Sequence, residues 1–258
     1  MTTLLYWPAV AQGNTPLTLP TDRVDCWAVS LTTLPADEEG MLHTLLSANE
    51  LECAERFRFE RLRARYISRH AALRLLIARY LQASPASLLF VPETNGRPIL
   101  ANPAGRLHFN LSHSGDVALV AVSCIAPVGV DVEEVRNITD FAEIARHHFA
   151  LTEVEDIFRL AVEKRLFAFF VTWTRKEAVV KALGAGLSFP LDAFSTGRPD
   201  GSPLLRLGGT PCTDWTMADL VPSGGHTASV AISHPNVSVR CQRAEWSWLL
   251  DRAHRSSA

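Results

Sequence analysis

The feature of this sequence that most constrains its fold is an order of elements that occurs twice. Each half of the chain has the pattern of a long helix, followed by a glycine-containing turn and then by short strands. Each half also ends in a similar apolar string, VALVAVS at 117–123 and ASVAIS at 228–233. Such self-similarity favours two related halves. Because Pro127 marks a plausible boundary, we expect an N-terminal half at 1–126 and a C-terminal half at 127–258.

Two long helices dominate the expected secondary structure. The sequence predicts a helix at 48–81, with room for one break, and a helix at 163–183 that Gly184 ends. Shorter helices are expected at 141–149 and 151–160. Strands are expected where short apolar runs lie between turn residues, at 24–31, 88–91, 99–100, 109–111, 117–123, 128–132, 204–207, 215–218 and 228–233.

Composition excludes several classes of protein. With 258 residues the chain can bury a sizeable core, and no apolar run approaches the ~18–20 residues of a membrane helix. Its five cysteines are dispersed without a CxxC pair, which argues for reduced thiols and against a disulfide framework or a zinc site. A net charge of −2 creates no field that attracts nucleic acid. We expect a cytoplasmic protein that binds neither nucleic acid nor membranes.

The first candidate site is the segment Gly-Val-Asp-Val-Glu at 129–133. Because side chains alternate along a strand, Asp131 and Glu133 are expected on one face. Two neighbouring carboxylates repel each other unless a cation lies between them. Such oxygen ligands suit Mg²⁺, which often takes one or two carboxylates together with substrate phosphates. The alternative is a solvated strand end that carries two unrelated acids.

The second candidate is the helical segment 173–181, Trp-Thr-Arg-Lys-Glu-Ala-Val-Val-Lys. Glu177 and Lys181 are four residues apart and share a helix face, so an exposed ion pair of little energetic consequence is one interpretation. However, the chain has only three lysines, and Lys176 and Lys181 are two of them. Glu177 is therefore a candidate third metal ligand, and the lysines beside it are candidates to hold phosphate oxygens or to stabilise a leaving group.

The third candidate is Ser112-His113-Ser114-Gly115, expected as a turn between two short strands. Hydroxyls, an imidazole and backbone N–H groups at such a turn can donate hydrogen bonds to a phosphate. A Ser–His nucleophile pair is the competing enzymatic interpretation, although neighbouring strand residues point apart and no GxSxG motif is present. A polar turn with a hydrogen-bonded histidine is the remaining alternative.

Arginines supply the last candidates. A run of arginines extends from Arg56 to Arg74 and includes Arg65. Because the overall charge is slightly negative, this run favours a local anion site over a nucleic-acid track. Arg97 lies apart from it, in the turn-forming segment Asn-Gly-Arg-Pro at 95–98. Neither a Walker P-loop nor a GxGxxG motif is present.

Taken together, these segments resemble the 4′-phosphopantetheinyl transferases, in the Sfp-type, pseudo-duplicated branch of that family. The resemblance covers the chain from Leu51 to His234. It is carried, in order, by RxRY with a downstream arginine at 63–74, NGRP at 95–98, FNLSHSG at 109–115, GVDVE at 129–133 and WTRKEAVVKALGAGLSFPL at 173–191. GVDVE with WTRKEAxxK is the pair that defines the family. Each piece alone is weak, whereas all five in order are highly specific.

The resemblance implies an α+β fold of two similar α/β halves, related by a pseudo-twofold axis, with the active site in the cleft between them. Each half would pack a small, mainly antiparallel sheet against a long helix. The implied reaction transfers the phosphopantetheine arm of coenzyme A to a serine of an apo acyl or peptidyl carrier protein and releases adenosine 3′,5′-bisphosphate. Mg²⁺ is the implied metal, with Mn²⁺ as an alternative. Because one duplicated chain would form the whole cleft, we expect a monomer.

The resemblance also assigns roles to residues. Asp131, Glu133 and Glu177 would hold Mg²⁺ on the coenzyme A pyrophosphate. Lys181 would neutralise the departing phosphate, and Glu177 would also be the general base for the carrier serine, so Glu177, Lys181 and Asp131 are the implied catalytic residues. The implied coenzyme A contacts are Arg65, Arg97, Ser112, His113, Lys176 and Lys181. One departure weakens the 3′-phosphate contacts: relatives often carry basic residues where this chain has Glu-Leu-Glu-Cys at 50–53.

Two other functions remain open from the sequence. One is another Mg²⁺-dependent phosphotransferase or phosphohydrolase that uses the same three carboxylates. The other is a non-catalytic domain that binds coenzyme A or a carrier protein. Because most carrier proteins are small and acidic, the arginine-rich helix and the segment 146–149 are candidate docking faces.

Overall fold

The computed structural model describes residues 7–8, 17–18, 22–32, 39–93, 97–102, 107–186 and 189–251. The helices are α1 (Glu39–Leu45), α2 (Ala48–Glu55), α3 (Glu60–Leu81), α4 (Phe141–His148), α5 (Leu151–Arg159), α6 (Val162–Leu183) and α7 (Trp246–Leu250), with 3₁₀ turns η1 (Pro85–Ser87) and η2 (Leu191–Ala193). The strands are β1 (Arg23–Ser30), β2 (Leu89–Pro92), β3 (Pro98–Asn102), β4 (His108–Ser114), β5 (Val117–Ser123), β6 (Val128–Glu134), β7 (Phe194–Ser195), β8 (Arg206–Leu207), β9 (Thr210–Pro211), β10 (Thr216–Leu220), β11 (His226–Ile232) and β12 (Ser238–Arg243). Of the expected Asn-Gly-Arg-Pro turn, Asn95 and Gly96 lie outside the described residues.

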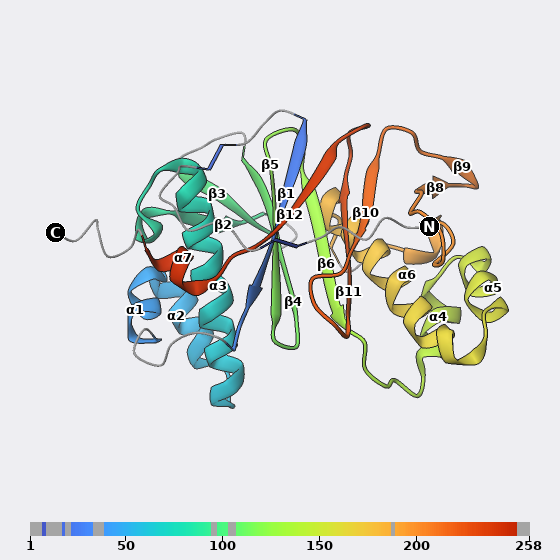
Figure 1. The fold of residues 1–258 in the computed structure, drawn as a ribbon, viewed down its shortest axis with the longest axis horizontal. Coiled ribbons are helices and arrows are strands. Elements are labelled where there is room, and N and C mark those ends of the chain that lie inside the picture. Colours follow the sequence, from blue (N-terminus) through green and yellow to red (C-terminus); the bar gives the residue numbers. More distant parts are fainter. Residues whose placement is uncertain are drawn as a thin grey trace.

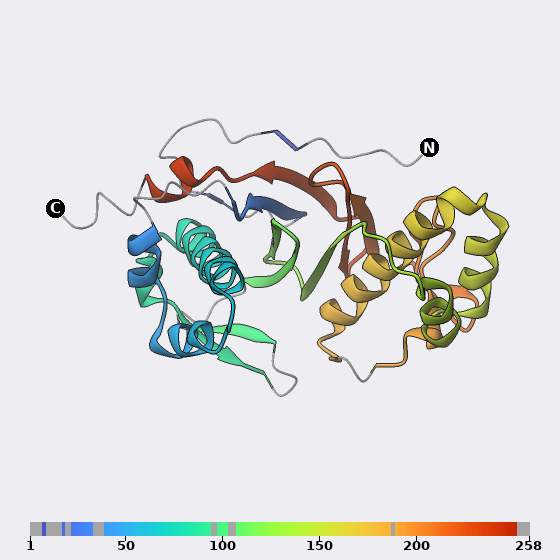
Figure 2. The same cartoon turned by 90° about the horizontal axis from the view of Figure 1, so that it is seen from below.

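Two long helices and two sheets organise the molecule. The helices α3 and α6 are each 22 residues long. They lie on the same side of the central strands, α3 in the N-terminal half and α6 in the C-terminal half (Figures 1 and 2). The helix expected at 48–81 is broken once, between α2 and α3. In the described part of the chain, no helix has the length and apolar character needed to cross a membrane.

The sheets are mainly antiparallel, as expected. The two larger sheets have the strand orders β12-β1-β5-β4 and β10-β11-β6, and two small sheets have the orders β2-β3 and β7-β8-β9. Within them only the β1–β12 pair is parallel. Apolar residues of α3 pack against β1 and β5 in one core, and a second core joins the two sheets. The architecture is therefore the predicted α+β fold, with one long helix and one larger sheet in each half.

Side chains of β4 join the two sheets where β4 faces β6. Every second residue of β4 accepts a hydrogen bond from a backbone N–H of β6. The pairs are Asn110 with Val130 at 2.9 Å, Ser112 with Val132 at 3.4 Å and Ser114 with Glu134 at 3.0 Å. We call these six residues the junction. They satisfy backbone donors on the edge of β6 that β11 does not pair.

The junction corrects one expectation about local structure. The segment at 112–115 is not a turn between short strands, because Ser112, His113 and Ser114 belong to β4 and the turn itself is formed by Gly115 and Asp116. Extended backbone is required here, since only alternation along a strand aims Ser112 and Ser114 at the same neighbour.

Gly129 determines how closely β6 approaches α6. A Cβ atom at this position would lie 2.0 Å from the carbonyl oxygen of Ala178 and 2.4 Å from the backbone nitrogen of Ala182. The strand and the helix therefore touch through their backbones, and no side chain larger than hydrogen fits between them. This close packing brings Asp131 next to the part of α6 that carries Lys181.

The C-terminal segment packs against the first half of the chain. Strand β12 pairs with β1 of the first half, and α7 packs into its core. Arg240 forms a two-point ion pair with Asp25 at 2.7 and 2.8 Å, and Trp248 stacks on Trp27 with ring centroids 5.3 Å apart. Without β12, the buried strand β1 would have an unpaired edge. The chain therefore returns to its first half after β11.

Candidate active site

Asp131 and Glu133 both point from β6 toward β4. Ser112 Oγ donates a hydrogen bond to Asp131 Oδ1 at 2.9 Å, and Ser114 Oγ donates one to Glu133 Oε2 at 2.9 Å. Alternate side chains of β4 thus pair with alternate side chains of β6, and each serine binds one acid. Ser112 is buried, and its hydroxyl is occupied within the protein. It orients an acid here, whereas the sequence led us to expect a phosphate contact.

Lys181 reaches from α6 to the same acid. Its Nζ lies 2.6 Å from Asp131 Oδ1 and also donates hydrogen bonds to Ser112 Oγ at 3.1 Å and to the carbonyl of Val130 at 3.3 Å. The ion pair at this point therefore joins Lys181 to Asp131 across two elements. It replaces the Glu177–Lys181 pair that helical spacing made available.

Glu177 faces the same group of charges. Burial, followed by the negative charge of Asp131, raises the pKa of Glu177 above its usual range. The same two causes, in the same order, raise the pKa of Glu133. Three carboxylates thus share a partly buried space in which Lys181 is paired with one of them.

The donor set of this space suits a hard divalent cation. Within the described residues, no group of three His, Cys, Asp or Glu side chains is arranged so that it could hold a metal ion as it stands. The oxygens nevertheless have the required chemistry. Asp131 Oδ2 is buried without a hydrogen-bond partner in the described part, and burial, followed by the charge of Asp131, raises the pKa values of Glu133 and Glu177. A cation between these acids would relieve both conditions.

Basic side chains lie beside the acids on the first half. Arg65 forms an ion pair with Asp116 of the β4–β5 turn. One helical turn further on, Arg69 Nη1 lies 3.1 Å from His113 Nε2. Burial, followed by the positive charges of Arg69 and Lys181, lowers the pKa of His113 to about 4. His113 is therefore neutral near pH 7 and is surrounded by cations.

Arg97 contacts the backbone of three different elements. Its guanidinium donates hydrogen bonds to the carbonyls of Lys181 at 3.2 Å, Phe109 at 3.3 Å and Val128 at 3.3 Å. These carbonyls come from α6, β4 and β6, so Arg97 ties the two halves together. Its contact with adenosine phosphate stays a prediction.

Lys176 does not join the other predicted residues. It is fully buried, and its Nζ lies 2.6 Å from Glu153 Oε2 and donates hydrogen bonds to the carbonyls of Leu191 at 2.7 Å and Phe194 at 2.6 Å. This placement contradicts the expected phosphate contact, because an amine with three protein partners and no exposed surface cannot reach a ligand. Lys176 instead anchors α6 to α5 and η2.

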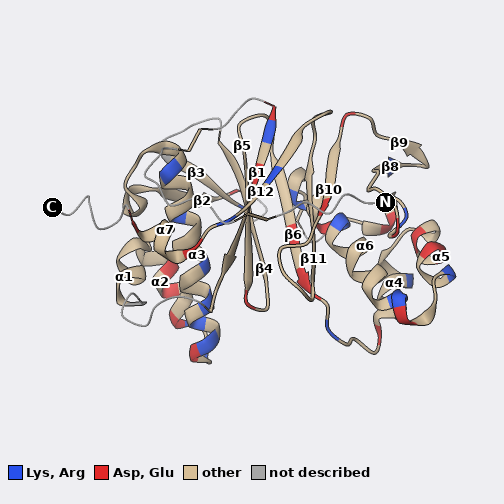
Figure 3. Cartoon of the chain, in the orientation of Figure 1, with Lys and Arg blue, Asp and Glu red and all other residues tan. Residues whose placement is uncertain are grey.

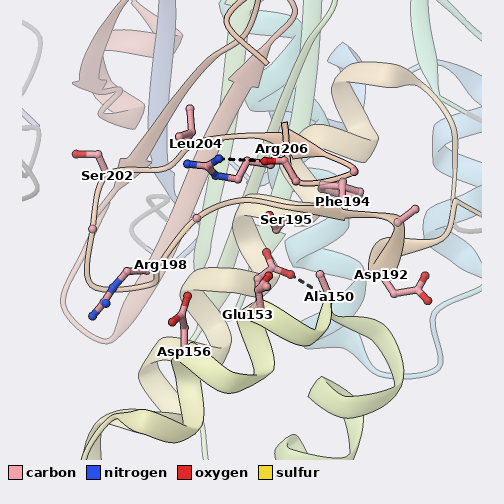
Figure 4. Close-up of a pocket in the computed structure, with 16 residues that line it drawn as sticks. Ala150, Glu153, Asp156, Asp192, Phe194, Ser195, Arg198, Ser202, Leu204 and Arg206 are labelled. Atoms are coloured by element: carbon pink, nitrogen blue, oxygen red, sulfur yellow. Dashed lines mark hydrogen bonds between the residues drawn. The ribbon is translucent and has the colours of Figure 1, made fainter. Parts of the chain in front are cut away.

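The cavity that Glu153 helps to line is separate from the acids. Its volume is about 640 Å³, and its walls come from α5 and from the loops and short strands between η2 and β9 (Figure 4). None of the described residues that line it belongs to the predicted site.

The low pKa of His113 makes the stability of the protein sensitive to acid. An unfolded histidine has a pKa of about 6.5. The folded pKa is depressed to about 4, so the unfolded state binds the proton more readily. The stability that neutral His113 contributes is present above about pH 6.5 and is lost as the pH falls through about 4. Because His113 is partly exposed, solvent screens the effect.

We expect the His113→Gln variant to lose less thermal stability than the wild type when the pH is lowered from about 7 to about 4.5. Glutamine can still accept a hydrogen bond from Arg69, but it does not titrate. Melting temperatures measured across this range test the expectation. Parallel pH profiles for the two proteins would contradict it.

The residues assigned roles from the sequence leave out three kinds of residue in this region. Asn110 and Ser114 complete the junction, and the alternation Asn-x-Ser-x-Ser in β4 was the available signal. Arg69 belongs to the arginine run from Arg56 to Arg74, in which only Arg65 was assigned a role. Glu153, the partner of Lys176, carried no local signal, since 23 positions separate the two residues.

Comparison with known proteins identifies the family. Residues 35–125 match the family model described as 4′-phosphopantetheinyl transferase, N-terminal, and residues 127–232 match the model described as 4′-phosphopantetheinyl transferase superfamily. The 4′-phosphopantetheinyl transferase HetI of Nostoc sp. is 34% identical over 84% of this chain and 90% of its own length. The 4′-phosphopantetheinyl transferase Sfp of Bacillus subtilis is 29% identical over 79% of this chain and 89% of its own length.

A mammalian protein also matches. The L-aminoadipate-semialdehyde dehydrogenase-phosphopantetheinyl transferase of Mus musculus is 28% identical over 82% of this chain and 75% of its own length. From the two family models and the similarity to HetI, the chain belongs to the 4′-phosphopantetheinyl transferase superfamily and is an enzyme of that class.

Proposed function

We propose that this protein transfers the 4′-phosphopantetheine of coenzyme A to a serine of an apo acyl or peptidyl carrier protein and releases adenosine 3′,5′-bisphosphate. The observation that carries the proposal is the group formed by Asp131, Glu133, Glu177 and Lys181, in which the lysine pairs with Asp131 and both glutamates have raised pKa values. Figure 3 marks the acidic stretch of β6 and the basic stretches of α3. His113, which lies 3.1 Å from Arg69 and within the influence of Lys181, connects the two, so candidate metal ligands and candidate phosphate-binding cations lie near one another.

In the proposed reaction the serine oxygen forms a bond to the phosphorus that carries pantetheine. The bond from that phosphorus to the bridging oxygen breaks, and adenosine 3′,5′-bisphosphate leaves with that oxygen. Glu177 accepts the serine proton, a role that its raised pKa favours. The charge of Lys181 stabilises the departing phosphate in this proposal, and its ion pair with Asp131, which fixes the ammonium, supports that role.

We assign Asp131, Glu133 and Glu177 as the residues that would hold Mg²⁺, or Mn²⁺ in its place. When bound, the cation would neutralise pyrophosphate oxygens. Ser112 and Ser114 support this role because each holds one of the two strand acids by a hydrogen bond of 2.9 Å. Both elements that carry these acids, β6 and α6, belong to one chain, which supports a monomeric enzyme. The five free cysteines support a reducing compartment such as the cytoplasm.

The test is incubation of the purified protein with coenzyme A, Mg²⁺ and a panel of apo carrier proteins, followed by intact-mass measurement. We expect one carrier or more to gain the mass of a single phosphopantetheinyl group. A carrier with its acceptor serine replaced by alanine is the matched control, and EDTA is expected to abolish the gain. Cleavage of coenzyme A without carrier modification would indicate a phosphohydrolase. Binding of coenzyme A without turnover would indicate a non-catalytic protein.

A further inference from the structure

The hydroxyl of Ser114 has its hydrogen bonds in a fixed direction. Its Oγ accepts from the backbone N–H of Glu134 at 3.0 Å, and this donor cannot change its role because a backbone N–H only donates. The hydroxyl carries one proton, which it donates to Glu133 Oε2 at 2.9 Å. Ser114 is buried, so water has little access to either contact. The side chain of Ser114 therefore connects the backbone of β6 to a carboxylate of the same strand.

The contacts of Glu133 all end on one of its two oxygens. Besides Ser114, Arg136 Nη1 lies 3.8 Å from the same Oε2 atom. In the described part of the chain, neither a hydrogen bond nor an ion pair reaches Oε1. The two oxygens of Glu133 are thus unequal, since Oε2 is held by the protein and Oε1 is left for another partner.

Asp131 shows the same division between its oxygens. Oδ1 accepts from Ser112 Oγ at 2.9 Å and lies 2.6 Å from Lys181 Nζ. Oδ2 is buried without a hydrogen-bond partner among the described residues. The two acids of β6 therefore each leave one oxygen without a protein contact, Oδ2 of Asp131 and Oε1 of Glu133.

The number of oxygens that each acid offers affects which cation binds well. Mg²⁺ is small, requires a nearly octahedral arrangement and binds through one or two carboxylates together with waters and substrate phosphates. Ca²⁺ is larger, takes more ligands and readily binds both oxygens of one carboxylate. A carboxylate that has one oxygen held by a buried hydroxyl suits the first of these cations and hinders two-oxygen binding to the second.

We propose that Ser114 is a positioning residue that holds Glu133 Oε2, presents Oε1 alone to the divalent cation and thereby makes the site prefer Mg²⁺ to Ca²⁺. The inference rests on the proposed function for the assignment of the cation to Glu133. Ser114 acts through this carboxylate and needs no contact of its own with the cation or with coenzyme A.

Ser114 is a cleaner position for a test than Ser112. The Oγ atom of Ser112 also accepts a hydrogen bond from Lys181 Nζ at 3.1 Å. A substitution of Ser112 would therefore disturb the lysine together with the acid. The contacts that Ser114 makes through its Oγ, in contrast, are with Glu133 and with the backbone of Glu134.

The experiment measures cation binding in the presence of coenzyme A and without a carrier protein. The EPR signal of free Mn²⁺ reports binding of Mn²⁺, and Mg²⁺ and Ca²⁺ are titrated as competitors. For Ser114→Ala we expect the Kd of Mg²⁺ to rise about tenfold, while the Kd of Ca²⁺ stays the same or falls. Ser114→Thr keeps the hydroxyl and should keep the preference of the wild type for Mg²⁺.

The matched control is Ser229→Ala. Ser229 lies directly opposite Asp131 in the pairing of β11 with β6, yet its hydroxyl contacts Asp219 at 3.2 Å and Thr174 at 3.3 Å. It is therefore a buried serine next to the acids that holds neither of them. We expect this variant to bind both cations as the wild type does, and melting temperatures check that all variants are folded.

Other outcomes overturn the inference. Equal weakening of both cations in Ser114→Ala would indicate a purely structural role, and unchanged Kd values would exclude any role in positioning. Loss of the preference in a folded Ser114→Thr protein would show that the hydroxyl is not its cause. A wild type that binds neither cation, or that does not prefer Mg²⁺, would also refute the inference. The proposed function fails separately, when the preference depends on Ser114 but no carrier protein gains mass.

Discussion

Replacing Asp131 by asparagine is expected to lower kcat/KM for carrier modification by about 10³-fold. The exchange keeps the size of the side chain and an oxygen that can accept from Ser112. It removes the charge that holds Lys181 Nζ at 2.6 Å, and it removes the carboxylate that the proposed cation requires. Initial rates of holo-carrier formation at saturating Mg²⁺ measure the effect, and the melting temperature checks that the variant is folded.

The matched control is Glu134→Gln, which makes the same change of charge three residues along the strand. Glu134 is exposed, and the junction uses its backbone N–H rather than its side chain. We expect this variant to keep a rate close to that of the wild type. If Asp131→Asn also kept a near-normal rate, the assignment of Asp131 would be wrong. If both variants lost activity equally, the loss would reflect net charge on β6 rather than a specific acid.

Local periodicity was sufficient to predict most of the scaffold. The 3.6-residue pattern located α3 and α6, and the two-residue pattern placed Asp131 and Glu133 on one face of β6. The same pattern was less informative for β4. The polar residues at 112–114 predict a turn, whereas they form part of β4. Their partner is the free edge of β6, and the polarity of a short segment does not reveal such a tertiary contact.

Contacts between residues far apart in the sequence explain the other differences between the expected and the observed structure. No property of residues 238–250 taken alone indicates that they return to β1, since the reasons for it are Asp25 and Trp27 at the other end of the chain. Likewise, helical spacing offered Glu177 as the partner of Lys181, whereas close packing at Gly129 brought Asp131 within reach. Spacing in the sequence shows which ion pairs are possible, and the packing of the backbone determines which of them form.

Lys176 shows why a cationic residue in a functional motif can have a structural role. Its scarcity in the chain and its position next to Glu177 suggested a phosphate contact. However, successive residues of a helix point about 100° apart, so a helix that presents Glu177 to the acids directs Lys176 elsewhere. Here it enters the core beside Glu153, which is 1% exposed. Arg175 is similarly buried and pairs with Asp219.

Replacing Lys176 by methionine is therefore expected to reduce the free energy of unfolding by about 3–5 kcal/mol. The substitution leaves the carboxylate of Glu153 buried with hydrogen bonds from Thr196 and Ala150 but with no cation. Urea unfolding measures the loss, and Lys164→Met, which changes an exposed lysine of the same helix, should have little effect. The double variant Lys176→Met with Glu153→Gln should recover part of the lost stability, because it removes the unpaired charge. A Lys176→Met protein of normal stability but with weakened coenzyme A binding would instead support the phosphate contact, since only a lysine that reaches the ligand could produce that result.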